Sequence, residues 1–257
     1  PGIKNIKDHP MLKGAERTLF FSASKPKVRI VGNGSILPDS KGLIFPFETI
    51  GLKSVTVRII KIYEETVHHF LQVNNLNESE SIFRFGKKIA EKNISLGVKE
   101  SDKSDWASHV LDLEKWIRPE PGAIYRVELD FNKKYSLYKC PSAYVDEEIE
   151  EEVQDDEVRS NQDYYDDYYY EGYDWYERED PCSDSYYYNN TIFTNVIASD
   201  LGVIAKRGEN GSYLFAVNNI VSTEPVASAK IELYNFQQQL LGTILTDSEG
   251  IAKTELK

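Results

Sequence analysis

The sequence contains few of the residues that most often carry chemistry. Its 257 residues include only two cysteines and four histidines. Only two of the histidines are adjacent, and adjacent side chains diverge on a strand and on a helix, so the pair cannot chelate one metal ion simply. We therefore interpret the histidines as exposed loop residues and expect no metal site and no cofactor. They are His9, His68, His69 and His109.

Motifs of known catalytic and nucleotide-binding sites are also missing. The sequence has no Gly-x-Ser-x-Gly elbow, phosphate loop, His-Glu-x-x-His zinc motif or dinucleotide fingerprint. The segment Gly32-Asn33-Gly34-Ser35 is rich in glycine, but it joins two predicted strands, and no helix follows to present its amides to a phosphate. We therefore expect no catalytic residue. An enzyme is the least favoured of the three functions that we consider, after a structural scaffold and a partner-binding module.

Long apolar runs and clustered basic residues are absent as well. No apolar stretch approaches the ~20 residues of a membrane-spanning helix, so we expect no membrane span. The net charge is 30 − 42 = −12, and residues 146–184 hold 18 Asp and Glu against two Arg. The rest of the chain therefore carries 28 basic and 24 acidic residues, or +4. Neither part offers the basic cluster that nucleic acid requires, which argues against that partner.

The length corresponds to about two domains, and short alternating apolar segments favour β-structure. The short alternating segments of residues 27–140 predict a first β-sandwich of about seven strands. The strongest strand signal is the alternation of residues 55–63. Residues 67–89 have no certain period, and we interpret them as one helical turn over 67–71 and a loop over 74–79. The fold class is therefore all-β.

Residues 193–257 predict a second sandwich of about six strands, one or two short of a closed one, which would leave an unpaired edge. Residues 1–26 are interpreted as the remainder of an upstream element. Because the first residue is Pro1 and the last residues still alternate like a strand, we expect both ends to be cut from a longer protein.

Between the two sandwiches, residues 141–192 form an acidic, tyrosine-rich insert. A run of like charge cannot form its own core, so a solvated spacer is favoured over docking on a basic surface and over specific Ca²⁺ binding. The aromatic half has enough area to lie on a neighbouring domain or a partner. Its candidate contact residues are Tyr168, Tyr169, Tyr170, Tyr173, Trp175 and Tyr176.

The two cysteines, Cys140 and Cys182, bracket the acidic stretch. They have neither a Cys-x-x-Cys spacing nor a nearby histidine cluster, which argues against zinc and leaves a disulfide or two free thiols. We favour the disulfide, because closing a loop of about 40 residues removes several kcal/mol of chain entropy from the unfolded state. A disulfide would imply an oxidising compartment.

Two passages resemble a known family. Residues 34–38 and 42–55 are similar to the "gxxLPxxxGLxxPFxxxxLkxV" passage of bacterial alpha-2-macroglobulins. Residues 198–208, 230–234 and 246–250 are similar to the "SdLGLiaKrg…akVelyd…tDadG" signature of the next macroglobulin domain in that family. The insert, with its end at Tyr173-Asp174-Trp175 and Pro181-Cys182, resembles that of Bacteroides-type members.

The resemblance implies consecutive fibronectin-III-like or immunoglobulin-like macroglobulin domains from the N-terminal half of a large periplasmic or cell-surface protein. Such a protein traps proteases after cleavage of a bait region, and many members then capture the protease through a Cys-x-Glu-Gln thioester. Cys140 is followed by Pro141-Ser142-Ala143 and Cys182 by Ser183-Asp184-Ser185, so neither matches that motif. The resemblance therefore implies a non-catalytic scaffold whose partners are proteases, through the full-length parent, and the other domains of the chain.

An adhesin-like or partner-binding module is the alternative. In that interpretation the acidic loop with its Tyr and Trp side chains is the binding surface, because these residues supply contact area at low entropic cost. In the scaffold interpretation, the aromatic half of the insert is a wedge that packs between the two sandwiches.

Overall fold

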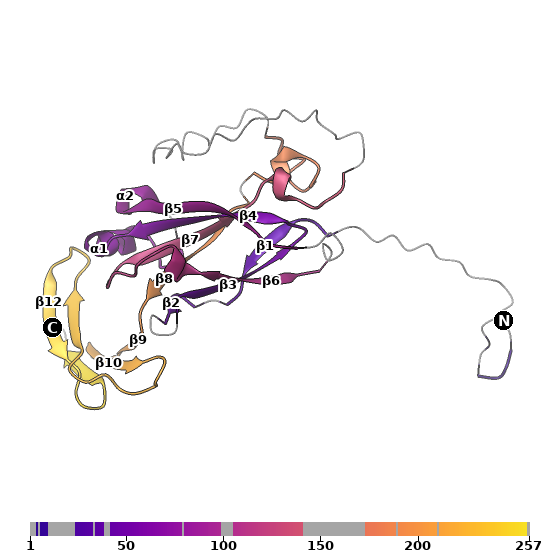
Figure 1. Ribbon diagram of the computed structural model, residues 1–257. Coiled ribbons are helices and arrows are strands. Elements are labelled where there is room, and N and C mark those ends of the chain that lie inside the picture. Colours follow the sequence, from indigo (N-terminus) through magenta and orange to yellow (C-terminus); the bar gives the residue numbers. More distant parts are fainter. Residues whose placement is uncertain are drawn as a thin grey trace.

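The computed structural model describes residues 4, 6–9, 24–32, 34–38, 42–78, 80–98, 105–140, 173–188, 190–209 and 211–255. These residues form two β-sandwich domains in tandem, and Figure 1 shows them one after the other along the molecule. The predicted all-β fold of macroglobulin type is confirmed. Residues 141–172, the main part of the predicted insert, lie outside the described residues, as does most of segment 1–26. No helix within the described ranges is long and apolar enough to span a membrane.

The first domain consists of a three-stranded and a five-stranded sheet. Its strands are β1 (Lys27–Ile30), β2 (Ile36–Leu37), β3 (Ile44–Ile50), β4 (Ser54–Ile62), β5 (Gly86–Ser95), β6 (Ala107–Asp112), β7 (Ile124–Asp130) and β8 (Ile192–Ala198). The order is β1-β3-β6 in one sheet and β2-β8-β7-β4-β5 in the other. Neighbouring strands are antiparallel except β2 and β8, which are parallel.

Strand β4 shows why the sequence forms a sandwich. Val55, Val57 and Ile59 alternate along it and are fully buried between the two sheets, where they pack in one core with Phe45 and Phe47 of β3. This confirms the alternation seen in the sequence, because successive strand residues point to opposite faces. The opposite face of β4 begins polar and becomes apolar toward its end, so that end needs a cover.

Two helices provide that cover. They are α1 (Glu64–Val73) and α2 (Ile82–Phe85). Phe70 of α1 is fully buried and meets Phe85 of α2 edge to face, with ring centroids 5.9 Å apart, in a cluster that includes Ile60 and Ile62 of β4. The prediction of a single helical turn over 67–71 was too short, because the burial of Phe70 on the sheet stabilises ten helical residues.

Strand β8 corrects the predicted domain boundary. Its residues pair with β7 from Ile124–Ile197 to Leu129–Ile192, and Val196 belongs to the first core. Residues 193–198 therefore belong to the first sandwich and not to the second domain. Among the residues that the structure describes, this sandwich has eight strands, against about seven predicted. The pairing joins strands more than 60 residues apart in sequence, so the local pattern of residues 193–198 could not reveal their partner.

The described part of the second domain contains five strands in two small sheets. They are β9 (Leu201–Arg207), β10 (Ser212–Asn219), β11 (Lys230–Tyr234), β12 (Leu240–Leu245) and β13 (Ile251–Glu255), in the orders β13-β10-β9 and β11-β12. Phe215, Val217 and Ala252 are its buried apolar residues. Several other apolar side chains of β9 and β12 are largely exposed, among them Val203 and Leu245.

The predicted turn at residues 247–250 joins β12 to β13. Asp247 Oδ1 accepts hydrogen bonds of 2.9 Å from the amides of Glu249 and Ile251. Gly250 has φ +72°, and a Cβ there would lie 2.3 Å from the carbonyl oxygen of Val217. Only glycine fits this position, because any side chain would collide with the backbone of β10.

Candidate contact site around the Cys140–Cys182 disulfide

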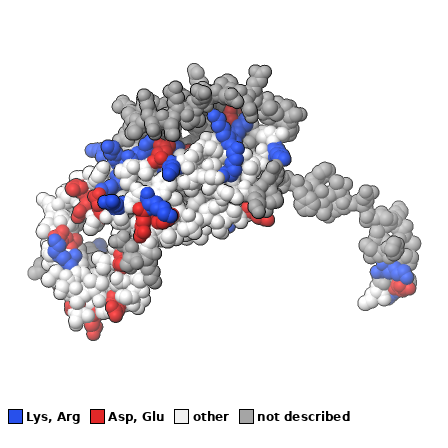
Figure 2. Space-filling view, in the orientation of Figure 1, with Lys and Arg blue, Asp and Glu red and all other residues white. Residues whose placement is uncertain are grey.

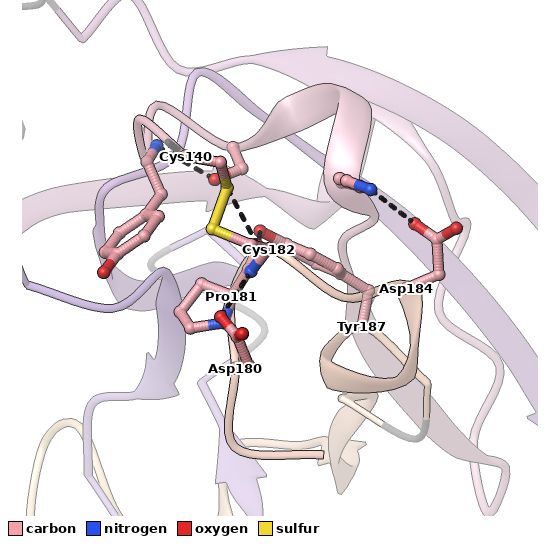
Figure 3. The surroundings of a disulfide bond; sticks show 9 residues. Cys140, Asp180, Pro181, Cys182, Asp184 and Tyr187 are labelled. Atoms are coloured by element: carbon pink, nitrogen blue, oxygen red, sulfur yellow. Dashed lines mark hydrogen bonds and ion pairs between the residues drawn. A yellow bond between two sulfur atoms is a disulfide. The ribbon is translucent and has the colours of Figure 1, made fainter. Parts of the chain in front are cut away.

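A disulfide joins the two cysteines of the chain (Figure 3). The Cα atoms of Cys140 and Cys182 are 5.5 Å apart, inside the normal range for a disulfide. Cys140 follows the short 3₁₀ helix η4 (Lys133–Tyr135), and Cys182 lies in the loop of residues 173–188, where it is buried. The predicted disulfide is confirmed over two free thiols, and it ties the end of the insert to the first domain.

Two tyrosines that follow Cys182 complete the first core. Tyr186 and Tyr187 are both buried, and the Tyr186 hydroxyl donates a 2.6 Å hydrogen bond to the carbonyl oxygen of Pro26. The Tyr187 hydroxyl donates a 2.8 Å hydrogen bond to the carbonyl oxygen of Pro181, and its ring meets Phe131 edge to face at 5.9 Å. The end of the predicted insert is therefore a structural part of the sandwich, which the sequence analysis missed.

Polar contacts hold the 173–188 loop in place. The amide of Cys182 donates a 2.9 Å hydrogen bond to Asp180 Oδ1, and Lys133 Nζ lies 3.3 Å from a carboxylate oxygen of Asp184 (Figure 3). Asp184 opens the 3₁₀ helix η6 (Asp184–Tyr186), whose N-terminal Ser183 accepts a hydrogen bond from the amide of Ser185. Lys25 Nζ donates to the carbonyl oxygen of Glu179. Asp180 therefore stabilises the loop internally, and Asp184 ties it to η4 of the first domain.

The predicted contact residues divide into two groups. Tyr168, Tyr169 and Tyr170 lie outside the described residues. Tyr173, Trp175 and Tyr176 are at the surface, with 40%, 59% and 87% of their areas exposed.

The ring contacts of the exposed group stay within the loop. Tyr173 lies 5.1 Å from Tyr188, and the Arg178 guanidinium stacks 3.3 Å from the centroid of Trp175. The described contacts between the two domains involve α1 instead, so a contact role for Trp175 remains a prediction.

The buried tyrosines predict a pH dependence of stability. Burial raises the pKa of Tyr186 and of Tyr187 above the usual value of about 10. Because the unfolded chain ionises first, their contribution is complete below about pH 10 and is lost as the pH rises through the folded pKa values. We expect the free energy of unfolding to fall above about pH 10, with each tyrosine adding a slope of up to about 1.4 kcal/mol per pH unit.

Urea unfolding at pH 8–11 measures this slope. Tyr186→Phe should reduce it, whereas Tyr176→Phe, at an exposed tyrosine of the same loop, should leave it unchanged. Equal slopes in the parent protein and in Tyr186→Phe would show that the buried hydroxyl does not control alkaline stability.

A buried ion cluster on the five-stranded sheet was not predicted. Arg126 Nε donates to Glu128 Oε1 at 2.5 Å, and Arg58 Nη1 lies 3.8 Å from the other carboxylate oxygen of Glu128. Glu128 is 1% and Arg126 5% exposed. Arg58 also forms a 2.9 Å ion pair with Asp130, and the Arg126 guanidinium stacks 3.4 Å from the ring centroid of Phe193. The only sequence signal was charge inside an otherwise apolar strand.

Three of the four histidines differ from the prediction, whereas His9 is exposed and outside any helix or strand. His68 and His69 lie on the exposed side of α1 rather than in a loop. His109 lies on β6, partly buried, with Nε2 2.9 Å from Thr49 Oγ1, and burial lowers its pKa. Within the part of the chain that the structure describes, no group of three or more His, Cys, Asp or Glu side chains could hold a metal ion.

Comparison with known proteins connects the second domain to a family. Residues 198–257 match the family model bMG3, the bacterial alpha-2-macroglobulin MG3 domain. The match begins where β8 ends, in agreement with the boundary seen in the strand pairing. No curated protein matches the sequence.

Three solved structures of alpha-2-macroglobulin from Escherichia coli share the fold. The fragment spanning domains MG0-NIE-MG1 has a TM-score of 0.56 at 14% identity over 100% of this chain and 66% of its own length. The NIE-MG1 fragment has 0.51 at 15% identity, over 90% of this chain and 87% of its own length.

The native conformation of the E. coli protein determined by cryo-EM has a TM-score of 0.50 at 15% identity. The match covers 98% of this chain and 13% of that protein, so this chain spans a small part of that protein's length. The family model and the shared fold confirm the resemblance of this chain to bacterial alpha-2-macroglobulins.

Proposed function

We propose that this chain is part of the non-catalytic scaffold of a bacterial alpha-2-macroglobulin-like inhibitor that entraps proteases. The observation that carries the proposal is the tandem arrangement of two sandwiches, the second of which matches a macroglobulin domain of this family. The chain spans 66% of the MG0-NIE-MG1 fragment of the E. coli protein. In this role the two domains pack against other domains of the same polypeptide and help to enclose the trapped protease. The protease itself is bound by the full-length parent protein.

The state of the cysteines supports a structural role. Cys140 and Cys182 are bonded to each other, so neither thiol is available to form a thioester with a glutamine. The disulfide also supports a periplasmic or cell-surface location, because disulfides persist in oxidising compartments. The charge distribution continues to argue against a nucleic-acid partner.

A partner-binding module remains the alternative function, favoured by the exposed rings of Trp175 and Tyr176. Arg178 and the disulfide hold these rings on an ordered loop, so a partner would meet a largely preformed surface. The paired experiment below separates the two functions.

The test is deletion of residues 146–171 from the full-length parent, which keeps both cysteines and the ordered 173–188 loop. A scaffold should still protect large protein substrates from a bound protease after the deletion. Trp175→Ala in the intact parent is the companion variant, because it removes the exposed ring. Loss of binding to a host or bacterial surface in either variant, with trapping absent from the parent, would favour the binding module.

A further inference from the structure

The two domains touch at the end of the β11–β12 hairpin. Gln72 Nε2 of α1 donates a 2.5 Å hydrogen bond to the carbonyl oxygen of Phe236. Gln238 Nε2 lies 3.5 Å from the carbonyl oxygen of His68, and the rings of His68 and Tyr234 have centroids 5.2 Å apart. Figure 1 shows this side of the second domain beside α1. We call residues 234–238 the contact turn.

The backbone of the contact turn holds an unusual conformation. Gln238 has φ +64°, a region that glycine and asparagine adopt more easily than glutamine. The turn is closed by hydrogen bonds between Asn235 and Gln239, including the amide of Asn235 to the carbonyl oxygen of Gln239 at 3.0 Å. A strained residue whose side chain reaches another domain points to a role for that side chain.

A bulge bends the hairpin next to the contact turn. The register of β11 and β12 shifts between Leu233 and Tyr234. Leu233 pairs with Gly242 and Tyr234 with Leu240, so the extra residue is Leu241 of β12, and a bulge of this kind bends its strand and increases the local twist. Tyr234 lies beside His68, and its hydroxyl donates a 2.9 Å hydrogen bond to Glu232 Oε2. The bulge and the strained turn together bring three groups of the second domain to α1.

The other connection between the domains is the chain itself. Only Ser199 and Asp200 separate β8 from β9. The amide of Ser199 donates to the carbonyl oxygen of Leu37 in the first domain at 3.0 Å, and the carbonyl oxygen of Asp200 accepts from the amide of Ile220 in the second at 2.8 Å. Each linker residue is thus tied to a different domain, which places a pivot between them.

The contacts between the contact turn and α1 are weaker than the covalent connection at Ser199–Asp200. The groups in the contact turn lie at the surface, with Phe236 70% exposed, and the contact consists of two side-chain amides on carbonyl oxygens and one ring pair. Exposed contacts of this kind exchange readily with water. We propose that the contact turn is a releasable latch on α1 that sets the angle of the second domain about the Ser199–Asp200 pivot.

The latch can be tested by pulsed EPR distance measurement on this chain alone. Spin labels are attached at Lys92→Cys on β5 and at Glu249→Cys in the β12–β13 turn, since the native cysteines are bonded and do not react. The test variant is Gln72→Ala/Gln238→Gly, which removes both amide contacts and relieves the strained φ. The matched control is Gln237→Gly, at the neighbouring exposed glutamine of the same turn.

The parent protein and the Gln237→Gly control should each give one narrow distance distribution. The test variant should show a second population, with the open form about tenfold more populated, a change equivalent to about 1.4 kcal/mol. Circular dichroism of all variants should be unchanged, because none of the substituted side chains is buried. A parent distribution that is already broad, or a test variant identical to the parent, overturns the latch. Because no protease is used, this result is independent of the entrapment proposal.

Discussion

Removal of the Cys140–Cys182 disulfide is expected to lower the free energy of unfolding of the first domain by about 4 kcal/mol. The two cysteines are 42 residues apart, and the chain-entropy relation for a loop of that size gives about this value. The bond also joins the loop that carries the core residues Tyr186 and Tyr187 to the rest of the first domain. Without it, the unfolded chain gains freedom and the 173–188 loop is tied to the domain only by its own contacts.

The double variant Cys140→Ser/Cys182→Ser measures this effect in urea unfolding. Serine keeps the size of the side chain while removing the bond, and the parent protein treated with reductant should show the same loss. Lys206→Ala, at an exposed residue of the second domain, provides a neutral reference. A loss below about 1 kcal/mol would mean that the disulfide contributes little to the fold.

Removal of the Glu128 carboxylate is expected to be the other large effect, costing about 3–5 kcal/mol. Glu128 is 1% exposed and faces the guanidinium groups of Arg126 and Arg58. In Glu128→Ala the buried Arg126 loses its counter-charge, and an uncompensated buried charge is strongly destabilising. The measurement is the free energy of unfolding in urea at neutral pH.

A double variant identifies the cause of that loss. In Arg126→Met/Glu128→Leu both charges are replaced by apolar groups of similar volume, which is often neutral for buried ion pairs. We expect the double variant to be more stable than Glu128→Ala, although it carries one more substitution. If its loss instead equals the sum of the losses of the single variants Arg126→Met and Glu128→Leu, then the pair does not act as a unit.

The strands were predictable where one face of a strand is buried and the other is not. In β4 the alternation of Val55, Val57 and Ile59 with polar residues identified the core face directly. The turn at Gly250 was predictable for a similar local reason, because its turn chemistry is contained in four residues. These features depend on neighbours in sequence, which a single sequence displays.

The remaining features depend on partners distant in sequence. Residues 193–198 alternate like any strand, and only their pairing with β7 assigns them to the first domain. Helix α1 has few helical signals of its own and is stabilised by the burial of Phe70 on the sheet. The Arg126–Glu128 pair lies two residues apart on one strand face, but the sequence cannot show that this face is covered.

The candidate site was predictable in part for the same reason. Two cysteines allow only one disulfide, and the entropy of loop closure favoured it over two free thiols, as the structure confirms. The tyrosines of residues 164–188 all resemble one another in sequence, and the structure alone distinguishes the buried Tyr186 and Tyr187 from the exposed Tyr176. Nothing in the sequence indicated that Gln72 and Gln238 make contacts between the domains, because glutamine is common in turns and on helix surfaces.

Entrapment by the full-length parent is the most direct test of the scaffold function. The parent is exposed to a substoichiometric protease, and the residual activity is measured on a small peptide and on a large protein substrate. If these domains are walls of a trap, the peptide is still cleaved while the large substrate is protected. Equal cleavage of both substrates would contradict entrapment and make partner binding the better description of this chain.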